Sequence, residues 1–565
     1  LTRKELIQLN FLATLVGLGA GFAAIGFRYM IGAFQNITLH NKFDYNLISP
    51  LGHVRGEWIF VILPAGLLLS NVITRFFARE ATGHGVPEVI ESVWTKSGKM
   101  RKRVVAVKAI ASSITIASGG SVGREGPIVQ IGSAFGSAIG QILKMKPKIM
   151  KTLVGCGAAG AVAATFNTPI AGVIFAIEVI VLELKTKSFV PLVISSVFAT
   201  VVSRVYIGNE PAFFVPEYAL KSPQELLFYM LLGILSGIVG VLVIKTLYGV
   251  EDFVDSIKAP FWTKPIVIGL MLAGMGQYFP EIYGVGYETT SQVLQQNSYF
   301  TLMFSLVFLK TIAMSLTIAA GGSGGVFAPS LFIGAMLGGS FGVIVNQFFP
   351  DFTGSYGAYA LVGMAAMFSA TARATFTAIV ILFEMTLDYS IILPLMFVCV
   401  AADQTAWALS KDTIYSMKLR RKGLNFVTDI SADVMQMTCV KDIMTTELDV
   451  IKKNMSFNYV VEKLLPHNHS AYPVVDSDGV LKGIVTKTTL ERYLQLNESP
   501  KIEDLMVPAK AVVSTDESVS TALAKIEKTR DPRILVVEKG SQKLVGIVSP
   551  IDFVRLNSNY LADQS

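Results

Sequence analysis

The feature that most constrains this chain is a glycine-rich stretch at residues 119–127, GGSVGREGP, which lies between apolar runs long enough to cross a bilayer. Glycines let backbone N–H groups approach a ligand closely, and Pro127 fits the first turn of a helix, where its missing N–H is not needed. Residues 123–127 therefore predict a loop that opens a helix, with free N–H groups and the positive end of the helix dipole directed at a ligand.

A carboxylate, Glu125, stands at this predicted helix start. A carboxylate at membrane depth is costly and marks an ion or proton pathway. The positive end of the helix attracts anions, so the carboxylate and a dissolved anion compete for the same place. We expect Glu125 to act as a gate that occupies the position of the anion until an anion or a proton displaces it.

The stretch occurs twice in the chain. Residues 321–329, GGSGGVFAP, align with the first copy without gaps at an offset of 202 residues, and nine of 22 paired positions are identical between 119–140 and 321–342. Shared apolar composition does not explain so many identities. Interrupted hydrophobic segments at matching positions of two halves point to a transporter binding site near the membrane midplane.

A second pair of similar segments follows, and each member ends in a glutamate: residues 153–178, ending at Glu178, and residues 361–384, ending at Glu384. We expect these two carboxylates to be structural and to accept hydrogen bonds from nearby helix ends, whose first N–H groups have no partner within their own helix. We do not assign them to the conduction path.

Three helix-start motifs occur in this order: GHGVP at 83–87, GREGP at 123–127 and GVFAP at 325–329. Together with the repeat, they resemble the CLC family of chloride channels and proton-coupled chloride transporters over roughly the first 420 residues. The resemblance implies an all-α polytopic membrane domain made of two inverted repeats of tilted helices. It also implies a homodimer in which each subunit holds its own pore, and a structural role for Lys108 inside the protein.

Composition supports a membrane protein. Hydrophobic residues make up 52% of the chain and charged residues only 16%, which excludes disorder and an ordinary soluble enzyme. The net charge of +7 comes with basic clusters at helix ends, at 99–103 and 418–422, which indicate interfacial anchors and not nucleic-acid binding. The three cysteines lie far apart and give no metal or disulfide pattern. We expect a multi-pass protein of a bacterial or archaeal plasma membrane.

After Gly423 the composition changes to that of a soluble α/β domain with two similar units, each of which ends in a GIV motif followed by Thr486 or Ser549. These units resemble a tandem CBS pair, which implies a cytosolic regulatory module. The predicted domains are residues 1–423 for anion transport (halves at about 1–207 and 224–423, separated by a polar loop at 208–222), 424–500 for the first CBS domain and 501–565 for the second.

CBS pairs often bind an adenine nucleotide, so the resemblance implies a site for ATP, ADP or AMP. The family's nucleotide-contacting positions match Ser549 and Asp552 in the second unit. In the first unit Thr486 matches, but Thr489 stands where an aspartate is expected, which argues against a nucleotide in that half-site. A purely structural dimerisation module has equal weight.

An anion that crosses lipid loses water, so it needs N–H and O–H donors without enough fixed positive charge to trap it. By resemblance, the donors come from three helix starts and from a tyrosine at the last membrane helix. The implied anion-binding residues are His84, Gly85, Gly126, Val326, Phe327 and Tyr415. Tyr415 alone would also fit an aromatic belt at the membrane interface, but its family position favours the pore.

His84 departs from the family, which usually has serine between the two glycines of this motif. A lone histidine is most often structural. A histidine at this entrance can also donate a hydrogen bond when neutral and carry charge when protonated. We favour a role in the pore, with a selectivity that differs from the usual one.

Val179 bears on proton coupling. Proton-exchanging relatives commonly carry a second glutamate at the position after the one that matches Glu178, and this chain has Val179 there. Valine cannot hold a proton, and a proton relay through an apolar region needs titratable or water-bridged stations. Channel members of the family also have valine at this place.

These residues favour a CLC-type chloride channel, with a chloride/proton antiporter on the same scaffold as the first alternative. A CBS-regulated divalent cation transporter would need carboxylates or carbonyls clustered along a path, and the chain offers helix N-termini instead. An intramembrane enzyme would need a nucleophile–base pair or a metal cluster, and none is apparent. We expect no catalytic residue, no metal site and no required cofactor. The expected partners are the bilayer, a second copy of the chain and a small anion.

Overall fold

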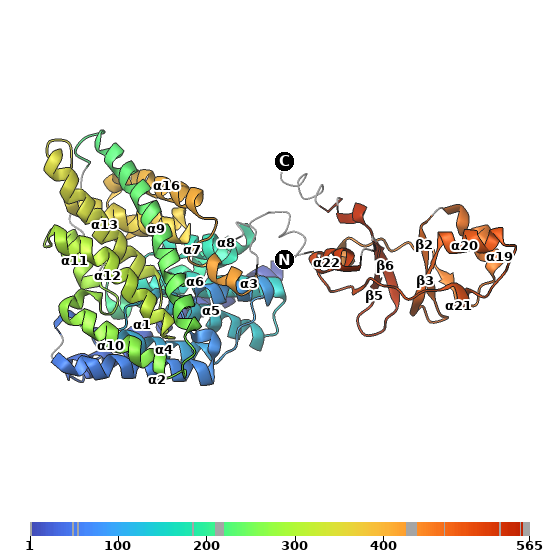
Figure 1. Cartoon of the computed structure of the whole chain (residues 1–565), viewed down its shortest axis with the longest axis horizontal. Helices are drawn as coiled ribbons and strands as arrows, with labels where there is room; N and C mark the ends of the chain where they lie inside the picture. Colours follow the sequence, from blue (N-terminus) through green and yellow to red (C-terminus); the bar gives the residue numbers. More distant parts are fainter. Residues whose placement is uncertain are drawn as a thin grey trace. The chain divides into compact units, whose positions relative to one another are not determined.

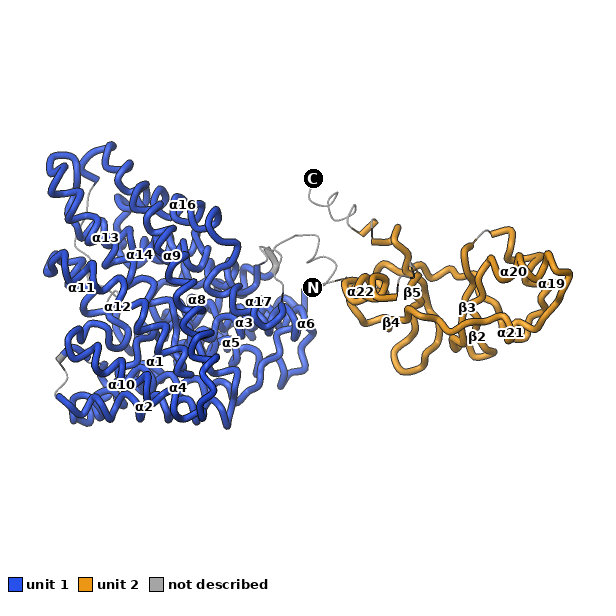
Figure 2. Tube along the Cα trace, in the orientation of Figure 1, with its two compact units in different colours: residues 1–424 blue, residues 425–565 orange. Residues whose placement is uncertain are grey.

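The computed structural model describes residues 3–47, 50–52, 56–182, 186–209, 220–424, 438–467, 469–529, 531, 533–553 and 555–556. The chain divides into two compact units, residues 1–424 and 425–565, which Figure 2 shows in blue and orange. The first unit is built from helices, and the second combines helices with short strands (Figure 1). Most of the polar loop expected at 208–222 lies outside the described residues.

The helices of the first unit form two sets that follow one another in the same order. The first set is α1 (Arg3–Gln35), α2 (Ile59–Phe77), α3 (Val86–Thr95), α4 (Val104–Ala117), α5 (Glu125–Ile142), α6 (Pro147–Phe166), α7 (Pro169–Phe175) with the π-helix η5 (Ala176–Val181), and α8 (Thr186–Ile207). The second set is α9 (Glu225–Ser256), α10 (Thr263–Tyr278), α11 (Tyr287–Leu294), α12 (Phe300–Ala319), α13 (Phe327–Phe348), α14 (Tyr356–Ala372), α15 (Thr375–Thr386) and α16 (Ile392–Leu409), after which α17 (Ser416–Arg421) ends the unit.

The two helices that follow the glycine-rich stretches keep the offset of the sequence repeat. Helix α5 begins at Glu125 and α13 begins at Phe327, which is 202 residues later. Eight helical segments of the described chain are long and apolar enough to cross a membrane, and the segments at Val104–Ala117, Pro169–Val181, Tyr356–Ala372 and Thr375–Thr386 are apolar but shorter. Short apolar helices are tolerated at membrane depth where protein surrounds their ends. The predicted membrane fold of two helical repeats is confirmed.

Backbone-to-backbone contacts set the crossing of the helices that carry the two glycine-rich starts. A Cβ atom on Gly132 of α5 would collide with the carbonyl oxygen of Gly157 in α6. The same relation holds in the second half, where a Cβ on Gly334 of α13 would collide with the carbonyl oxygen of Gly363 in α14. Only glycine permits so close an approach, so these contacts fix how far α5 and α13 reach into the protein.

The two glutamates predicted to be structural cap each other's helices. Glu178, in η5, accepts hydrogen bonds from Phe376 N (3.1 Å), Thr377 N (2.8 Å) and Thr377 Oγ1 (2.6 Å) at the start of α15. Glu384, near the end of α15, accepts hydrogen bonds from Ile170 N (3.0 Å) and Ala171 N (2.7 Å) at the start of α7. Each half of the repeat therefore satisfies the unpaired N–H groups of the other half.

The second unit contains one α/β pattern twice. Its elements are β1 (Ile451–Lys452), α19 (Phe457–Lys463), β2 (Ala471–Val475), β3 (Leu481–Thr486), α20 (Lys487–Gln495), α21 (Ile502–Leu505), β4 (Val512–Ser514), α22 (Val519–Thr529), β5 (Ile534–Val537) and β6 (Leu544–Val548). The strands form two three-stranded sheets, β1-β2-β3 and β4-β5-β6. In each sheet the first pair is parallel and the second pair is antiparallel, so the copies share one topology.

We expect Glu384→Gln to lower the midpoint of thermal unfolding of the detergent-solubilised protein. Glutamine leaves one oxygen and turns an NH2 group toward a backbone N–H, so one charge-assisted hydrogen bond, worth about 2 kcal/mol, is lost. Asp351→Asn is the control, because Asp351 is an exposed carboxylate on a turn of the same unit. Equal midpoints for the two variants would contradict the structural role of Glu384.

Candidate functional site

The two glycine-rich loops meet at the starts of α5 and α13. Gly123 N donates to Gly325 O (2.7 Å), and Gly325 N donates to Gly123 O (2.6 Å), so the loops pair like two antiparallel strands. The starts of both helices therefore lie side by side at one junction. The first N–H groups of each helix have no acceptor within their own helix, which makes the junction a place where an anion can be bound.

Two buried lysines hold the neighbouring loops in place. Lys108 Nζ donates to the carbonyl oxygens of Ala81 (2.9 Å) and Gly83 (2.6 Å), just ahead of α3. Its counterpart in the second repeat is Lys310, which donates to the carbonyl oxygens of Ile282 and Gly284, both at 2.9 Å. These contacts satisfy carbonyl groups inside the protein, and Lys108 makes the internal contacts that the sequence predicts for it.

Glu125, the predicted gate, is the first residue of α5 and is 1% exposed. Its Oε1 accepts a hydrogen bond from the hydroxyl of Tyr287, the first residue of α11, and lies 3.8 Å from Arg124 Nε. The Arg124 guanidinium lies over the Tyr287 ring, 5.1 Å from its centroid. A side chain at Gly123 would collide with the Glu125 carboxylate and contact Ala328, so the carboxylate lies at the junction of the two loops.

A cavity of about 200 Å³ is lined in part by Arg124 and Tyr287, the two residues whose side chains contact the Glu125 carboxylate. Arg124, Tyr283, Tyr287 and Glu288 are among the residues that line it. Both residues that contact Glu125 thus face a space that water and ions can occupy. The lining of this cavity is mixed, with apolar residues such as Ile31, Leu51 and Ile116 beside Arg124 and Glu288.

Tyr287 was not predicted, although the chain contains a signal for it. Residues 284–287, GVGY, match the GHGV of residues 83–86 at an offset of 201, and the helices that follow, α3 and α11, keep that offset. The two segments share only their glycines. The repeat therefore has four helix-start loops, of which sequence motifs reveal three.

Val326 and Phe327, predicted to offer N–H groups, lie at the start of α13 and are buried. The Phe327 ring packs against Phe368 (centroids 4.2 Å apart), Phe166 (5.3 Å) and Phe175 (6.4 Å). Phe327 is also the counterpart of Glu125 at the repeat offset. One helix start therefore presents a carboxylate, and the other presents an aromatic ring held by three more rings.

Tyr415, His84, Gly85 and Gly126 lie together. Tyr248 of α9 donates a hydrogen bond from its hydroxyl to the carbonyl of Ile414 (2.6 Å), and the same hydroxyl lies 3.4 Å from His84 Nε2. A side chain on Gly126 would collide with the His84 carbonyl and meet the backbone of Gly325.

Two further contacts complete this cluster. A side chain on Gly85, where φ is +87°, would meet the carbonyl oxygen of Gly126 at 3.0 Å. Tyr415 is buried and lies close enough to Glu125 to interact with it electrostatically. The predicted anion-binding residues thus surround the same junction as Glu125, although their roles remain predictions.

Val179, where exchangers commonly carry a glutamate, is buried in η5, and η5 packs against α3. The neighbouring Glu178 is engaged by three donors at the start of α15. Glu178 is therefore held as a helix cap and is not placed to substitute for an acid at Val179.

The predicted nucleotide-binding residues form hydrogen bonds with side chains of their own CBS unit. Asp552 Oδ2 accepts hydrogen bonds from the N–H and the hydroxyl of Ser549, both at 2.8 Å, and Thr486 Oγ1 lies 2.8 Å from Thr489 Oγ1. The nucleotide role of Thr486, Ser549 and Asp552 remains a prediction.

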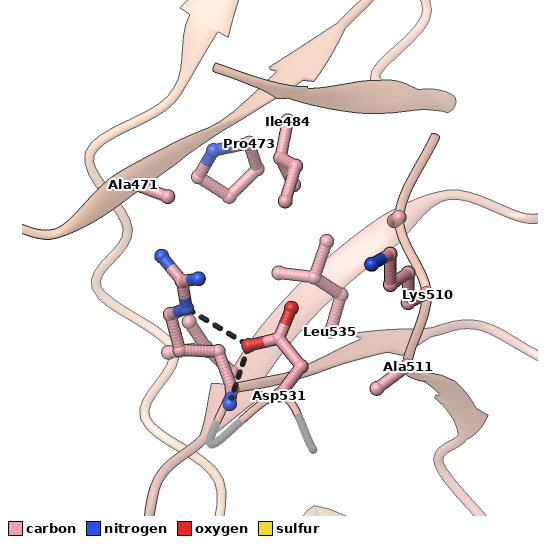
Figure 3. Close-up of a pocket in the computed structure, with 10 residues that line it drawn as sticks. Ala471, Pro473, Ile484, Lys510, Ala511, Asp531 and Leu535 are labelled. Atoms are coloured by element: carbon pink, nitrogen blue, oxygen red, sulfur yellow. Dashed lines mark hydrogen bonds and ion pairs between the residues drawn. The ribbon is translucent and has the colours of Figure 1, made fainter. Parts of the chain in front are cut away.

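A cleft lies between the two copies (Figure 3). Its walls include Ile484 of β3 and Ile547 of β6, which lie two residues ahead of Thr486 and Ser549, but the three predicted nucleotide residues are not part of its lining. Its lining combines residues of both copies: Ala471, Pro473, Ile484, Ala509, Lys510, Ala511, Asp531, Arg533, Leu535 and Ile547. Arg533 Nε donates to Asp531 Oδ1 (3.1 Å) within this lining.

Comparison with known proteins agrees with the geometry of the junction. The model of the family described as "Voltage gated chloride channel" matches residues 66–406, and the CBS domain model matches 440–496 and 502–559. The chain belongs to the CLC family. A protein of Ralstonia nicotianae named as a ClcB-like chloride channel protein is 29% identical over 415 residues, which are 73% of this chain and 96% of that one.

Other CLC proteins similar to this chain are exchangers by name. The H(+)/Cl(-) exchange transporter ClcA of Vibrio vulnificus is 32% identical over 428 residues, which are 74% of this chain and 90% of that one. The crystal structure of a slow cyanobacterial Cl-/H+ antiporter superposes with a TM-score of 0.67 at 25% identity, and covers 73% of this chain and 97% of that one. The protein is therefore a multi-pass membrane protein of the CLC family with two C-terminal CBS domains.

We expect Tyr287→Phe to raise the chloride efflux of reconstituted protein at neutral pH by about tenfold or more. Phenylalanine keeps the ring that packs against Arg124 but removes a hydrogen bond to a carboxylate, worth about 1.5–3 kcal/mol, so Glu125 leaves its position more often. Tyr283→Phe is the matched control, because Tyr283 lines the same cavity and donates to the Ala273 carbonyl instead. A Tyr287→Phe efflux no higher than that of the control would contradict this account.

Proposed function

We propose that the protein exchanges chloride for protons across the membrane. The observation that carries this proposal is the position of Glu125: a buried carboxylate at the junction of two helix starts, held by the hydroxyl of Tyr287. A carboxylate competes with chloride as an anion, and once protonated it loses that competition and leaves with its proton. One group can therefore couple both ions.

The comparisons support the exchanger over the channel that the sequence favours. The relatives from Vibrio and the cyanobacterial structure are named as exchangers or antiporters, whereas the channel hypothesis rests on Val179. The passive channel remains the second candidate, because Val179 is buried beside Glu178 and cannot hold a proton.

His84 offers the titratable group that Val179 lacks. The Tyr248 hydroxyl donates its proton to the Ile414 carbonyl, so this hydroxyl can only accept a hydrogen bond from His84. Such a bond requires that Nε2 of His84 carry the proton. His84 Nδ1 then presents a lone pair, and it has no hydrogen-bond partner among the described residues. Protonation turns Nδ1 into an N–H donor, which attracts chloride. Glu88 lies within electrostatic range of the ring and favours this protonation, whereas Lys108, Lys418 and Lys422 lie within the same range and oppose it.

The remaining features follow from the family and remain proposals. We propose a homodimer with one pore per subunit, with chloride bound by donors at His84, Gly85, Gly126, Val326, Phe327 and Tyr415. The proposed domains are residues 1–423 for transport, with 424–500 and 501–565 as cytosolic CBS domains. A weakly bound adenine nucleotide at Ser549 and Asp552 is proposed as a regulator, because these two residues match the nucleotide-contacting positions of CBS domains.

We expect a chloride gradient to drive protons uphill in vesicles that contain the protein, and the reversal potential to shift when a pH gradient is imposed. Glu125→Gln should abolish proton movement and its pH dependence while chloride still passes, because glutamine neither competes as an anion nor takes up a proton. A reversal potential that follows chloride alone in the unsubstituted protein would establish the passive channel instead.

We expect His84→Ser to lower the number of protons moved per chloride and to flatten the pH response on the side of the membrane that His84 faces, because serine donates a hydrogen bond but does not titrate. Tyr248→Phe is the companion variant, since it removes the contact at Nε2 and leaves the imidazole. If coupling, selectivity and pH response are all unchanged in His84→Ser, then His84 only fills space.

A further inference from the structure

Two of the five histidines of the chain converge on one carboxylate in the first CBS domain, outside the transport path. His467 Nδ1 lies 2.7 Å from Asp449 Oδ2, and His469 Nε2 lies 3.0 Å from the same oxygen. The three ligand atoms all lie within 4.8 Å of one another. In sequence, Asp449 lies 18 residues ahead of His467, so folding brings the group together.

The backbone that carries these side chains is anchored to the sheet. Asp449 lies just ahead of β1, which pairs with β2 in parallel, and His469 lies just ahead of β2. His467 ends a short turn, Leu465–His467, and its N–H donates to Leu464 O (3.1 Å). The Tyr472 hydroxyl of β2 donates to the same carbonyl (2.6 Å), which ties the turn to the sheet.

The rings are held as well as the backbone. The His469 ring meets the Tyr472 ring edge to face, with centroids 5.8 Å apart, and the planes of the two imidazoles are nearly perpendicular at 89°. The contact with Tyr472 limits the rotation of the His469 ring, and the two imidazoles do not stack on each other.

The donor set is that of a zinc site with an open position. Zinc takes imidazole nitrogen and carboxylate oxygen at about 2.0–2.2 Å in a tetrahedron, which places neighbouring ligand atoms about 3.3 Å apart. The present spacings of 2.7 and 3.0 Å to the shared oxygen need only small rotations to reach that value. The side chains of His467 and His469 are 52% and 56% exposed, so water can complete the coordination.

The donor types also select the class of metal. Ionised carboxylate and imidazole are both ligands of divalent transition metals, whereas Mg²⁺ and Ca²⁺ prefer sites made of oxygen alone.

We propose that Asp449, His467 and His469 form a site for a divalent transition metal, with zinc as its natural occupant. This departs from the expectation of no metal site, which was drawn from cysteine spacing and from histidines that looked scattered in the sequence. The proposal does not depend on whether the membrane domain exchanges ions or conducts them. A bound ion would lock the turn at 465–467 onto the loop ahead of β1.

The test measures zinc binding to the full-length protein in detergent, after the protein has been stripped with a chelator. Bound zinc is counted by elemental analysis after desalting, and its affinity is measured by competition with a chromophoric chelator. We expect one zinc per chain, an affinity about tenfold or more weaker in His467→Gln and in His469→Gln, and no displacement by excess Mg²⁺. Cobalt(II) added in place of zinc should give the visible absorption of a four-coordinate site.

Two control variants separate this site from other zinc ligands. Glu462→Gln removes an exposed carboxylate of α19, and Cys439→Ser removes the half-buried thiol of the same unit. Both should bind zinc as the unsubstituted protein does. The proposal is overturned if the unsubstituted protein binds no zinc, which would leave Asp449 as a hydrogen-bond acceptor for two histidines. It is equally overturned if the double variant His467→Gln/His469→Gln still binds one zinc per chain.

Discussion

The absence of water within a bilayer is the constraint on which this structure depends, because every broken helix end must then find its partners inside the protein. The first unit breaks its helices repeatedly, and the repeat supplies the partners in pairs. Glu178 caps α15 while Glu384 caps α7, and Lys108 and Lys310 each bind two carbonyl groups of a loop in their own half. The same devices bring the glycine-rich loops into register at Gly123 and Gly325.

This arrangement separates two carboxylates that cap helices from the one that we propose as a gate. Glu178 and Glu384 use both oxygens to receive backbone N–H groups, which cannot turn away while their helices remain folded. Glu125 receives the hydroxyl of Tyr287, a side-chain group that can rotate, the backbone N–H groups of Glu125 and Ala328 also interact with its carboxylate, and Arg124 lies at 3.8 Å. Glu125 therefore differs from the two capping glutamates in that a tyrosine hydroxyl holds it.

The features that could be predicted from the sequence are those that depend on a short local motif or on the internal repeat. Glycine, proline and charge at one helix start predict the loops of α5 and α13, and the repeat predicts the structural glutamates. Sequence reasoning missed Tyr287 because its loop shares only two glycines with residues 83–86, too few to stand out. It also missed Tyr248 beside His84 and the convergence of Asp449 with His467 and His469. Such contacts join distant segments, and local periodicity carries no information about them.

At two matching helix starts, the two halves of the repeat carry different residue types, and this difference makes the two faces of the membrane domain unequal. If the two halves were identical, the protein would look the same from both faces of the membrane, and neither face could be told from the other. The first half instead places Glu125 where the second places Phe327, and His84 where the second places Val285. The backbone at these helix starts is repeated in the two halves, whereas these side chains are not. The two halves therefore place different chemistry at matching helix starts, an acid and an imidazole in one half and an aromatic ring and a valine in the other, so the two faces of the membrane domain differ.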